Sequence, residues 1–108
     1  MILFYLICLH FICDYPLQGD TVAREKNRHS PSELQKYVPW YYWLFSHAAM
    51  HALAVVFVTN NLILGILELI AHWIIDYGKC EKWYDIHVDQ ALHIGCKILW
   101  WVALLWLN

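Results

Sequence analysis

Ionisable side chains recur at every fourth position in the most apolar parts of this sequence. Glu68, His72 and Asp76 follow this spacing inside a run of Leu, Ile and Trp residues. Because residues four apart lie on one side of a helix, these three side chains would share a face. The spacing returns in three other segments, as His10/Asp14/Gln18, His47/His51 and Asp89/His93/Lys97. Such groups are costly in lipid, so we expect the four faces to turn toward one interior.

Imidazole and carboxylate groups in this pattern point to a transition-metal site. Two ligands at i and i+4 can reach one ion, and helix bundles build metal sites from facing helices. We expect a divalent transition metal, zinc before manganese, iron or nickel, with ligands drawn from eight residues: His10, Asp14, His47, His51, His72, Asp76, Asp89 and His93. A structural or proton-conducting hydrogen-bond network is the alternative for the same residues.

Glu68 and Lys97 carry opposite charges at a similar predicted depth near the membrane midplane. A buried ion pair that joins the third helix to the fourth is the simpler interpretation. The second interpretation makes Glu68 a general base toward a metal-activated water. The predicted catalytic residues are therefore Glu68 and Asp76. Depth along the helices further predicts a layer of aspartates, then a layer of histidines, then a midplane group of Glu68, His51 and Lys97.

Composition indicates elements that lie in lipid. The 108 residues are 61% hydrophobic and only 15% charged, against about 25% charged in soluble domains. We expect one all-α domain over residues 1–108, a four-helix transmembrane bundle with spans at about 1–18, 39–59, 62–77 and 86–107. The first loop should carry a short surface helix that begins at Ser30-Pro31-Ser32-Glu33, with Ser30 as cap and Glu33 closing a capping box.

Basic residues orient the predicted spans. They lie in the segment 19–38 (Arg24, Lys26, Arg28 and Lys36) and between the third and fourth spans (Lys79 and Lys82). Since basic loops stay in the cytoplasm, the sequence predicts a multi-pass protein of the inner (cytoplasmic) membrane with both termini outside the cytoplasm.

Other features limit the classes of partner. The net charge of -2 and the lack of a basic patch or glycine-rich phosphate loop argue against nucleic acid. The four cysteines, Cys8, Cys13, Cys80 and Cys96, form no CxxC motif and suggest no disulfide framework. The expected partner is the lipid bilayer, and a homo-oligomer would help so small a chain to cover a polar cavity.

The ordered motifs resemble a known family. They run as His10-x-x-x-Asp14-x-x-x-Gln18, His47-x-x-x-His51, His72-x-x-x-Asp76 and Asp89-Gln90-x-x-His93 over nearly the whole chain. This order resembles the small bacterial and phage membrane proteins of domain-of-unknown-function family 3307. The resemblance implies a polytopic inner-membrane protein but no activity. A fainter likeness in layout is to small proteins described as membrane-bound metal-dependent hydrolases.

Three functional hypotheses follow from these patterns. The first is a metal-dependent membrane hydrolase that acts on a lipid head group or a membrane-embedded chain near the cytoplasmic leaflet. The second is a conduit for protons or metal ions, although the outer halves of the second and fourth spans are apolar. The third is a phage accessory protein that binds a host membrane protein and has a purely structural polar core.

Overall fold

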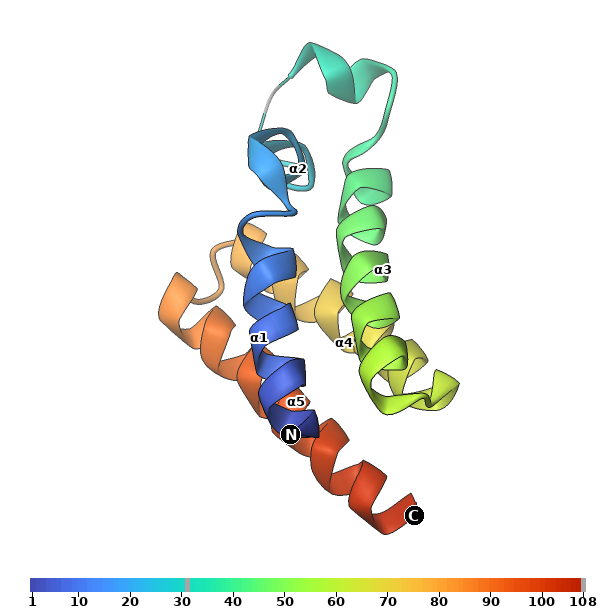
Figure 1. Ribbon diagram of the computed structural model, residues 1–108. Coiled ribbons are helices and arrows are strands. Elements are labelled where there is room, and N and C mark those ends of the chain that lie inside the picture. Colours follow the sequence, from blue (N-terminus) through green and yellow to red (C-terminus); the bar gives the residue numbers. More distant parts are fainter. Residues whose placement is uncertain (31, 108) are drawn as a thin grey trace.

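The chain folds into helices joined by short links in the computed structural model, which describes residues 1–30 and 32–107. No strand occurs in these two ranges. The elements, shown in Figure 1, are α1 (Ile2–Asp14), α2 (Gly19–Glu25), a 3-10 helix η1 (Glu33–Lys36), α3 (Trp40–Thr59), α4 (Leu62–Cys80) and α5 (Ile86–Leu107). The predicted all-α class is confirmed.

The link between α3 and α4 is as short as the sequence predicts. Asn60 adopts the left-handed conformation (φ 52°) that ends α3, which asparagine tolerates better than most residues. The side chain of Asn61 accepts a hydrogen bond from the Leu64 amide at 3.0 Å and so caps α4. The two caps turn the chain back on itself, and α3 and α4 pack as an antiparallel hairpin.

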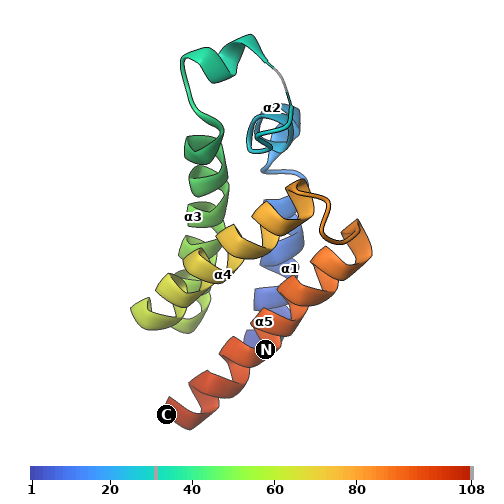
Figure 2. The ribbon, with the colours of Figure 1, turned by 180° about the vertical axis from the view of Figure 1, so that it is seen from behind.

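A close approach of backbones holds this hairpin together. A side chain at Gly65 would overlap the Val56 side chain, and its Cβ would lie 3.3 Å from the Ala52 carbonyl oxygen. Glycine at this position therefore lets α4 lie directly against α3, as small residues do between helices in membranes. Helix α1 packs on α3, and α5 packs on both α4 and α1. Figure 2 shows the molecule from behind, where α4 and α5 run obliquely in front of α1.

The first loop differs from its prediction. The predicted surface helix is a single 3-10 turn, η1, and its cap is Ser32, whose Oγ accepts from the Leu34 amide at 3.1 Å. The prediction of Ser30 as cap was wrong, and Pro31 lies outside the described residues. A second short helix, α2, was not predicted. It follows α1 with a bend of 83°, and the left-handed φ of Gly19 (71°) allows the chain to turn there.

The helix ends also move two side chains relative to expectation. Helix α1 ends at Asp14, so Gln18 does not continue its polar face but turns back and donates to the Asp14 carbonyl oxygen at 3.0 Å. Helix α4 runs on to Cys80, past the predicted end of the third span at residue 77. Asp76 consequently lies one turn inside the helix rather than next to its last residue.

Two helices, α3 and α5, are long and apolar enough to cross a membrane, and the bent pair α1 and α2 would supply a third crossing. Their 20 and 22 residues correspond to about 30 and 33 Å at ~1.5 Å per residue, which matches the hydrocarbon core. Helix α4 is not in this group because it carries Glu68, Asp76 and Lys79. Length and composition thus give two or three membrane-crossing elements, which indicates membrane association.

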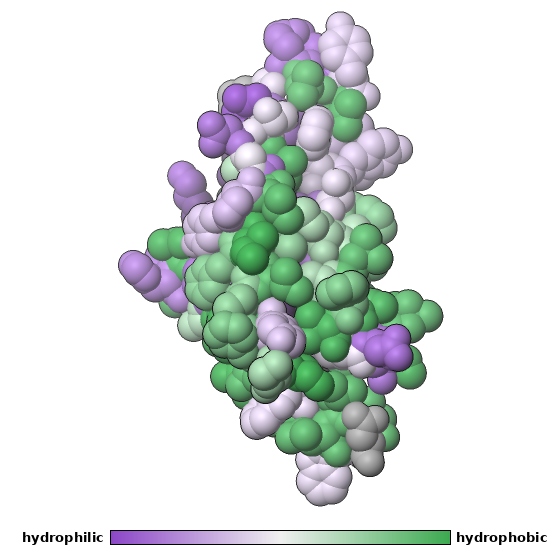
Figure 3. Space-filling view, in the orientation of Figure 1, coloured by the Kyte–Doolittle hydropathy of each residue, from purple (hydrophilic) through white to green (hydrophobic). Residues whose placement is uncertain are grey.

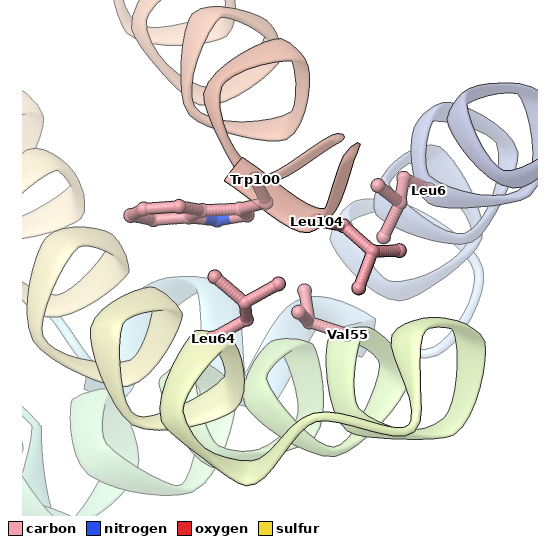
Figure 4. Close-up of a cluster of buried hydrophobic side chains, with 5 residues drawn as sticks. All are labelled: Leu6, Val55, Leu64, Trp100 and Leu104. Atoms are coloured by element: carbon pink, nitrogen blue, oxygen red, sulfur yellow. The ribbon is translucent and has the colours of Figure 1, made fainter. Parts of the chain in front are cut away.

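The surface and the core are consistent with this association. In Figure 3 the visible face over α1, α3 and α5 is mainly hydrophobic, and hydrophilic residues gather at the end that carries α2 and η1. The apolar core lies at the opposite end of the helices. Figure 4 shows that one side chain each from α1, α3 and α4 and two from α5 meet there: Leu6, Val55, Leu64, Trp100 and Leu104.

Candidate metal centre

Side chains of five histidines meet between α1, α3, α4 and α5. His10, His47, His51, His72 and His93 are each 1% exposed. Their rings are in mutual contact: the centroids of His51 and His72 lie 3.8 Å apart, and those of His72 and His93 lie 4.2 Å apart. The structure therefore confirms the prediction that the four polar faces converge. We call this cluster, together with Asp14, Glu68, Asp76, Asp89 and Lys97, the polar core.

All eight predicted metal ligands fall into three overlapping groups, within each of which one donor atom per residue lies within 4.8 Å of the others. The largest is the four-ligand group, which takes one residue from α1, two from α3 and one from α4: Asp14, His47, His51 and His72. The carboxylate group comprises Asp76, Asp89 and His93, and a third group comprises His10, His72 and His93. Metal binding by these residues stays a prediction.

The four-ligand group is centred on one oxygen of Asp14. His47 Nε2 donates to Asp14 Oδ1 at 3.0 Å, and His51 Nε2 lies 3.3 Å from the same oxygen without the alignment of a hydrogen bond. His72 Nε2 is buried and has no hydrogen-bond partner among the described residues. Two imidazole nitrogens and a carboxylate oxygen at such short separations are spaced as ligands of one ion are spaced.

Glu68 holds the ring of His72 in place. His72 Nδ1 donates to Glu68 Oε1 at 3.3 Å, and Nε2 of the same ring is buried without a hydrogen-bond partner among the described residues. Glu68 also accepts from Lys97 Nζ at 2.6 Å and from Trp100 Nε1 at 2.6 Å. The predicted ion pair between Glu68 and Lys97 is therefore confirmed. A carboxylate behind a ligating imidazole is the usual device for selecting its tautomer.

Gln90 links the two aspartates that face the histidines. Its side-chain amide nitrogen donates to Asp14 Oδ2 at 2.8 Å and to Asp89 Oδ2 at 3.1 Å, and its oxygen accepts from His10 Nε2 at 3.0 Å. In each of the two carboxylates, one oxygen accepts from Gln90 and the other oxygen faces an imidazole. Asp14 Oδ1 faces His47 and His51, and Asp89 Oδ1 lies 3.3 Å from His93 Nε2.

Lys26, from the loop after α2, reaches the polar core. It is 4% exposed, and its Nζ donates to Asp76 Oδ2 at 2.6 Å. The same oxygen lies 3.7 Å from His47 Nε2. Asp76 and Glu68, the two predicted catalytic carboxylates, are therefore each paired with an ammonium group, and a role of either as general base stays a prediction.

The buried charges do not balance when the imidazoles are neutral. Four carboxylates lie in the polar core, and within residues 1–30 and 32–107 only Lys26 and Lys97 oppose them, which leaves two negative charges. Asp14 and Asp89 are the two without an ammonium partner among the described residues. Since isolated buried charge is strongly unfavourable, the core calls for one divalent cation or for protonated imidazoles.

Three residues of this network were not predicted to take part. Lys26 was assigned only to the basic loop, and a cationic side chain in a predicted cytoplasmic loop carries no sequence signal that it turns inward. Trp100 was not among the candidate site residues. Gln90 was noted within a motif but given no role, although its position next to Asp89 and three residues before His93 was the available signal.

The predicted depth layers interleave rather than stack. The sequence predicted His51 in the midplane group and Asp14 in the layer nearest the cytoplasmic edge, yet His51 Nε2 and Asp14 Oδ1 are 3.3 Å apart. The prediction failed because it counted residues inward from span ends that were themselves only approximate. His87 is exposed. His29 is exposed too, but it contacts Glu81, its Nε2 lying 2.9 Å from Glu81 Oε2.

Ionisable groups join the loop after α2 to the link between α4 and α5. Arg28 makes two hydrogen bonds to Glu81, and this pairing, with a smaller effect of His29, lowers the pKa of Glu81 to about 2. Burial raises the pKa of Tyr84 to about 12, and Asp89 and Asp76 add to the effect. Tyr84 therefore stays protonated and donates to the Ile75 carbonyl oxygen, which ties the link between α4 and α5 to α4.

Comparison with known proteins gives a family and no further relative. A search of curated proteins and a search of solved structures each found no match. A family model with the description "Protein of unknown function (DUF3307)" matches residues 2–108, essentially the whole chain. The chain therefore belongs to this family of proteins of unknown function.

Proposed function

We propose that this protein is a metalloprotein of the inner membrane that holds a zinc ion in the four-ligand group, in the cytoplasmic half of a four-helix transmembrane bundle. The observation that carries the proposal is the convergence of His47 Nε2 and His51 Nε2 on Asp14 Oδ1, beside the unpartnered His72 Nε2. Three imidazoles and one carboxylate are a donor set that zinc accepts in four-coordinate geometry.

Charge and hydrogen bonding support the same proposal. One divalent cation would offset the two negative charges left in the polar core. Glu68 orients His72 and Gln90 orients Asp14, so two of the four ligands are supported from behind, as metal ligands usually are. The length and apolar composition of α3 and α5 support a location of this site within a bilayer, where α4 would be the fourth crossing, shielded by its neighbours.

The experiment is metal analysis of protein purified in detergent, stripped with a chelator and reloaded with Zn²⁺. We expect the wild type to retain zinc, and His51→Gln to lose it with an affinity reduced by at least tenfold. His87→Gln is the matched control, because His87 is exposed and lies outside all three groups. Wild-type protein that binds no more zinc than His51→Gln would overturn the proposal.

Hydrolysis is the reaction that we propose for such an ion. Held by three histidines and a carboxylate, a zinc ion would have to take a water as a fifth ligand, and as a Lewis acid it would then lower the pKa of that water. The substrate class would be an ester of a lipid head group or a membrane-embedded chain, presented from the cytoplasmic leaflet. Product analysis on phospholipid vesicles tests this step. Equal turnover by the wild type and by His51→Gln would show that the zinc site does not catalyse this hydrolysis.

A conduit is the second candidate, since five contacting imidazoles form a continuous path for protons. The apolar core argues against a complete path. Leu6, Val55, Leu64, Trp100 and Leu104 close the helices beyond Glu68 and Lys97 (Figure 4). A proton or Zn²⁺ flux in liposomes that contain the wild type, absent with His51→Gln, would favour the conduit over the hydrolase.

A further inference from the structure

The carboxylate group holds donor atoms that one zinc ion in the four-ligand group does not use. Asp89 Oδ1 and both ring nitrogens of His93 are buried and have no hydrogen-bond partner among the described residues. His93 is 1% exposed and Asp89 is 2% exposed. His93 Nε2 lies 3.3 Å from Asp89 Oδ1, and Asp76 brings a third donor within 4.8 Å of both. Leaving three such atoms unsatisfied in the interior is costly, so they require a partner.

We propose that Asp76, Asp89 and His93 bind a second divalent cation, next to the zinc of the four-ligand group. This inference rests on the proposed function, because it assigns the neighbouring site. The two sites are in direct contact: the rings of His72 and His93 stack at 4.2 Å, and His47 Nε2 lies 3.7 Å from Asp76 Oδ2. Two-metal sites that hydrolyse esters place their ions side by side in this manner.

Gln90 gives the two sites a common support. One amide nitrogen holds Oδ2 of Asp14 and Oδ2 of Asp89, so that Oδ1 of the first belongs to the four-ligand group and Oδ1 of the second to the carboxylate group. The donor sets differ in kind. Two carboxylates and one imidazole suit a harder ion, such as Mn²⁺ or Fe²⁺, than three imidazoles and one carboxylate do.

Lys26 is the group with which the second ion would compete. Its ammonium lies 2.6 Å from Asp76 Oδ2 and, together with Lys97 and one zinc ion, would balance the four carboxylates of the polar core. A second divalent cation would therefore leave an excess of two positive charges, which falls to one when Lys26 withdraws. Because Lys26 comes from the loop after α2 and not from a long helix, it can withdraw without a change in the helix packing. Binding of the second cation would therefore be coupled to the position of this loop.

The test is a Mn²⁺ titration of detergent-purified full chain that has been stripped and then loaded with one equivalent of Zn²⁺. Mn²⁺ binds more weakly than Zn²⁺ to a given site, so it does not displace the zinc. Bound Mn²⁺ is counted from the loss of the free-ion electron paramagnetic resonance signal, and zinc is counted in parallel. We expect one Mn²⁺ per zinc-loaded chain in the wild type.

Variants assign the ion to its residues. Asp89→Asn should weaken Mn²⁺ binding at least tenfold and leave the zinc content unchanged, and Lys26→Gln should strengthen Mn²⁺ binding. Asp85→Asn is the matched control, since Asp85 is exposed and caps α5, a task that asparagine also performs. Thermal unfolding of each variant shows that the fold is retained.

The outcomes separate the two proposals. Zinc retained by a wild type that takes up no Mn²⁺ overturns the second site and leaves the proposed function standing. Equal Mn²⁺ affinity of Asp89→Asn and Asp85→Asn also overturns the second site. A wild type that holds neither ion overturns both proposals.

Discussion

At the scale of single residues, Glu68 is a hydrogen-bond acceptor that joins α4 to α5 within the polar core. Its two oxygens receive hydrogen bonds from Lys97, Trp100 and His72, which come from α5 and from α4 itself. Since it is 1% exposed, water does not replace any partner that is removed. The cost of losing one partner is therefore set by the charge that stays behind and not by the strength of the lost bond.

Lys97→Met should consequently destabilise the protein strongly. We expect a loss of about 3–5 kcal/mol, the usual cost of a buried carboxylate that has lost its ion-pair partner. The measurement is thermal unfolding in detergent, followed by the loss of monodisperse protein. The control is the double variant Glu68→Gln with Lys97→Met, which removes both charges and should recover much of the loss. If the double variant is as unstable as the sum of the single variants, the two residues are not coupled.

At the scale of elements, the α3–α4 hairpin positions three of the four proposed zinc ligands. His47 and His51 lie on α3 and His72 lies on α4, so the distance between the two helices sets the distance between their imidazoles. That distance is short because Gly65 has no side chain to hold Val56 away. A stability change at Gly65 should therefore appear in the metal site as well.

Gly65→Ala should separate the two helices. We expect a loss of about 1–3 kcal/mol from overpacking, because the new methyl group would overlap Val56 and press on the Ala52 carbonyl. Zinc retention should fall together with thermal stability. Gly95→Ala is the matched control: no atom lies within 4 Å of the added methyl group, and α5 should gain about 0.5–1 kcal/mol from the better helix former. Equal behaviour of the two variants would contradict the close-packed hairpin.

The loop that carries Lys26 depends on a different element contact, between Arg28 and Glu81. The pKa of Glu81 is about 2 in the folded protein, below its ordinary value, because Arg28 stabilises the carboxylate. A lowered pKa contributes stability that is complete above the ordinary value of about 4.3 and is lost as the pH falls toward 2. The attachment of the loop to the end of α4 should therefore hold at neutral pH and weaken in acid.

Glu81→Gln tests this pH dependence by difference. The melting temperature of the wild type should exceed that of Glu81→Gln at pH 6, and the gap should close as the pH approaches 2.5. Both proteins carry the same histidines, so other acid effects cancel in the comparison. Glu33→Gln is the control, since Glu33 pairs only with Lys36 and its side chain is 84% exposed. A gap that is independent of pH would show that the ion pair is not its cause.

The elements also show what can be predicted from a sequence of this kind. The spacing of four identified the polar faces because an ionisable group on an apolar helix has no acceptable place except the interior, whatever the details of packing. The loop residues follow no such rule. Lys26 turns inward, and α2 lies at 83° to α1, through contacts that form only in the folded protein. The observed cap is Ser32 and not Ser30, because either serine suits the local pattern.

At the scale of the whole molecule, polarity differs between the two ends. The end with α2, η1 and the α4–α5 link carries Arg24, Lys26, Arg28, Lys36, Lys79 and Lys82, whereas the chain termini lie toward the apolar end (Figures 1 and 3). The longest dimension, 47 Å, exceeds the hydrocarbon core of about 30 Å, so a molecule whose long axis crosses the bilayer would project into water at one end. The charged end is the one that can do so.

The basic end should therefore face the cytoplasm, with both termini on the opposite side. Fusions at the C-terminus test this arrangement: alkaline phosphatase should be active there, and green fluorescent protein, which does not mature after export, should stay dark. The same pair of reporters inserted between η1 and α3 should give the reverse result. Fluorescence at both positions would mean an odd number of crossings, with α4 lying along the membrane, and would place His72 outside a four-helix enclosure. The zinc site would then need a second copy of the chain to shield it from lipid, because the charge on α4 cannot face hydrocarbon without a partner.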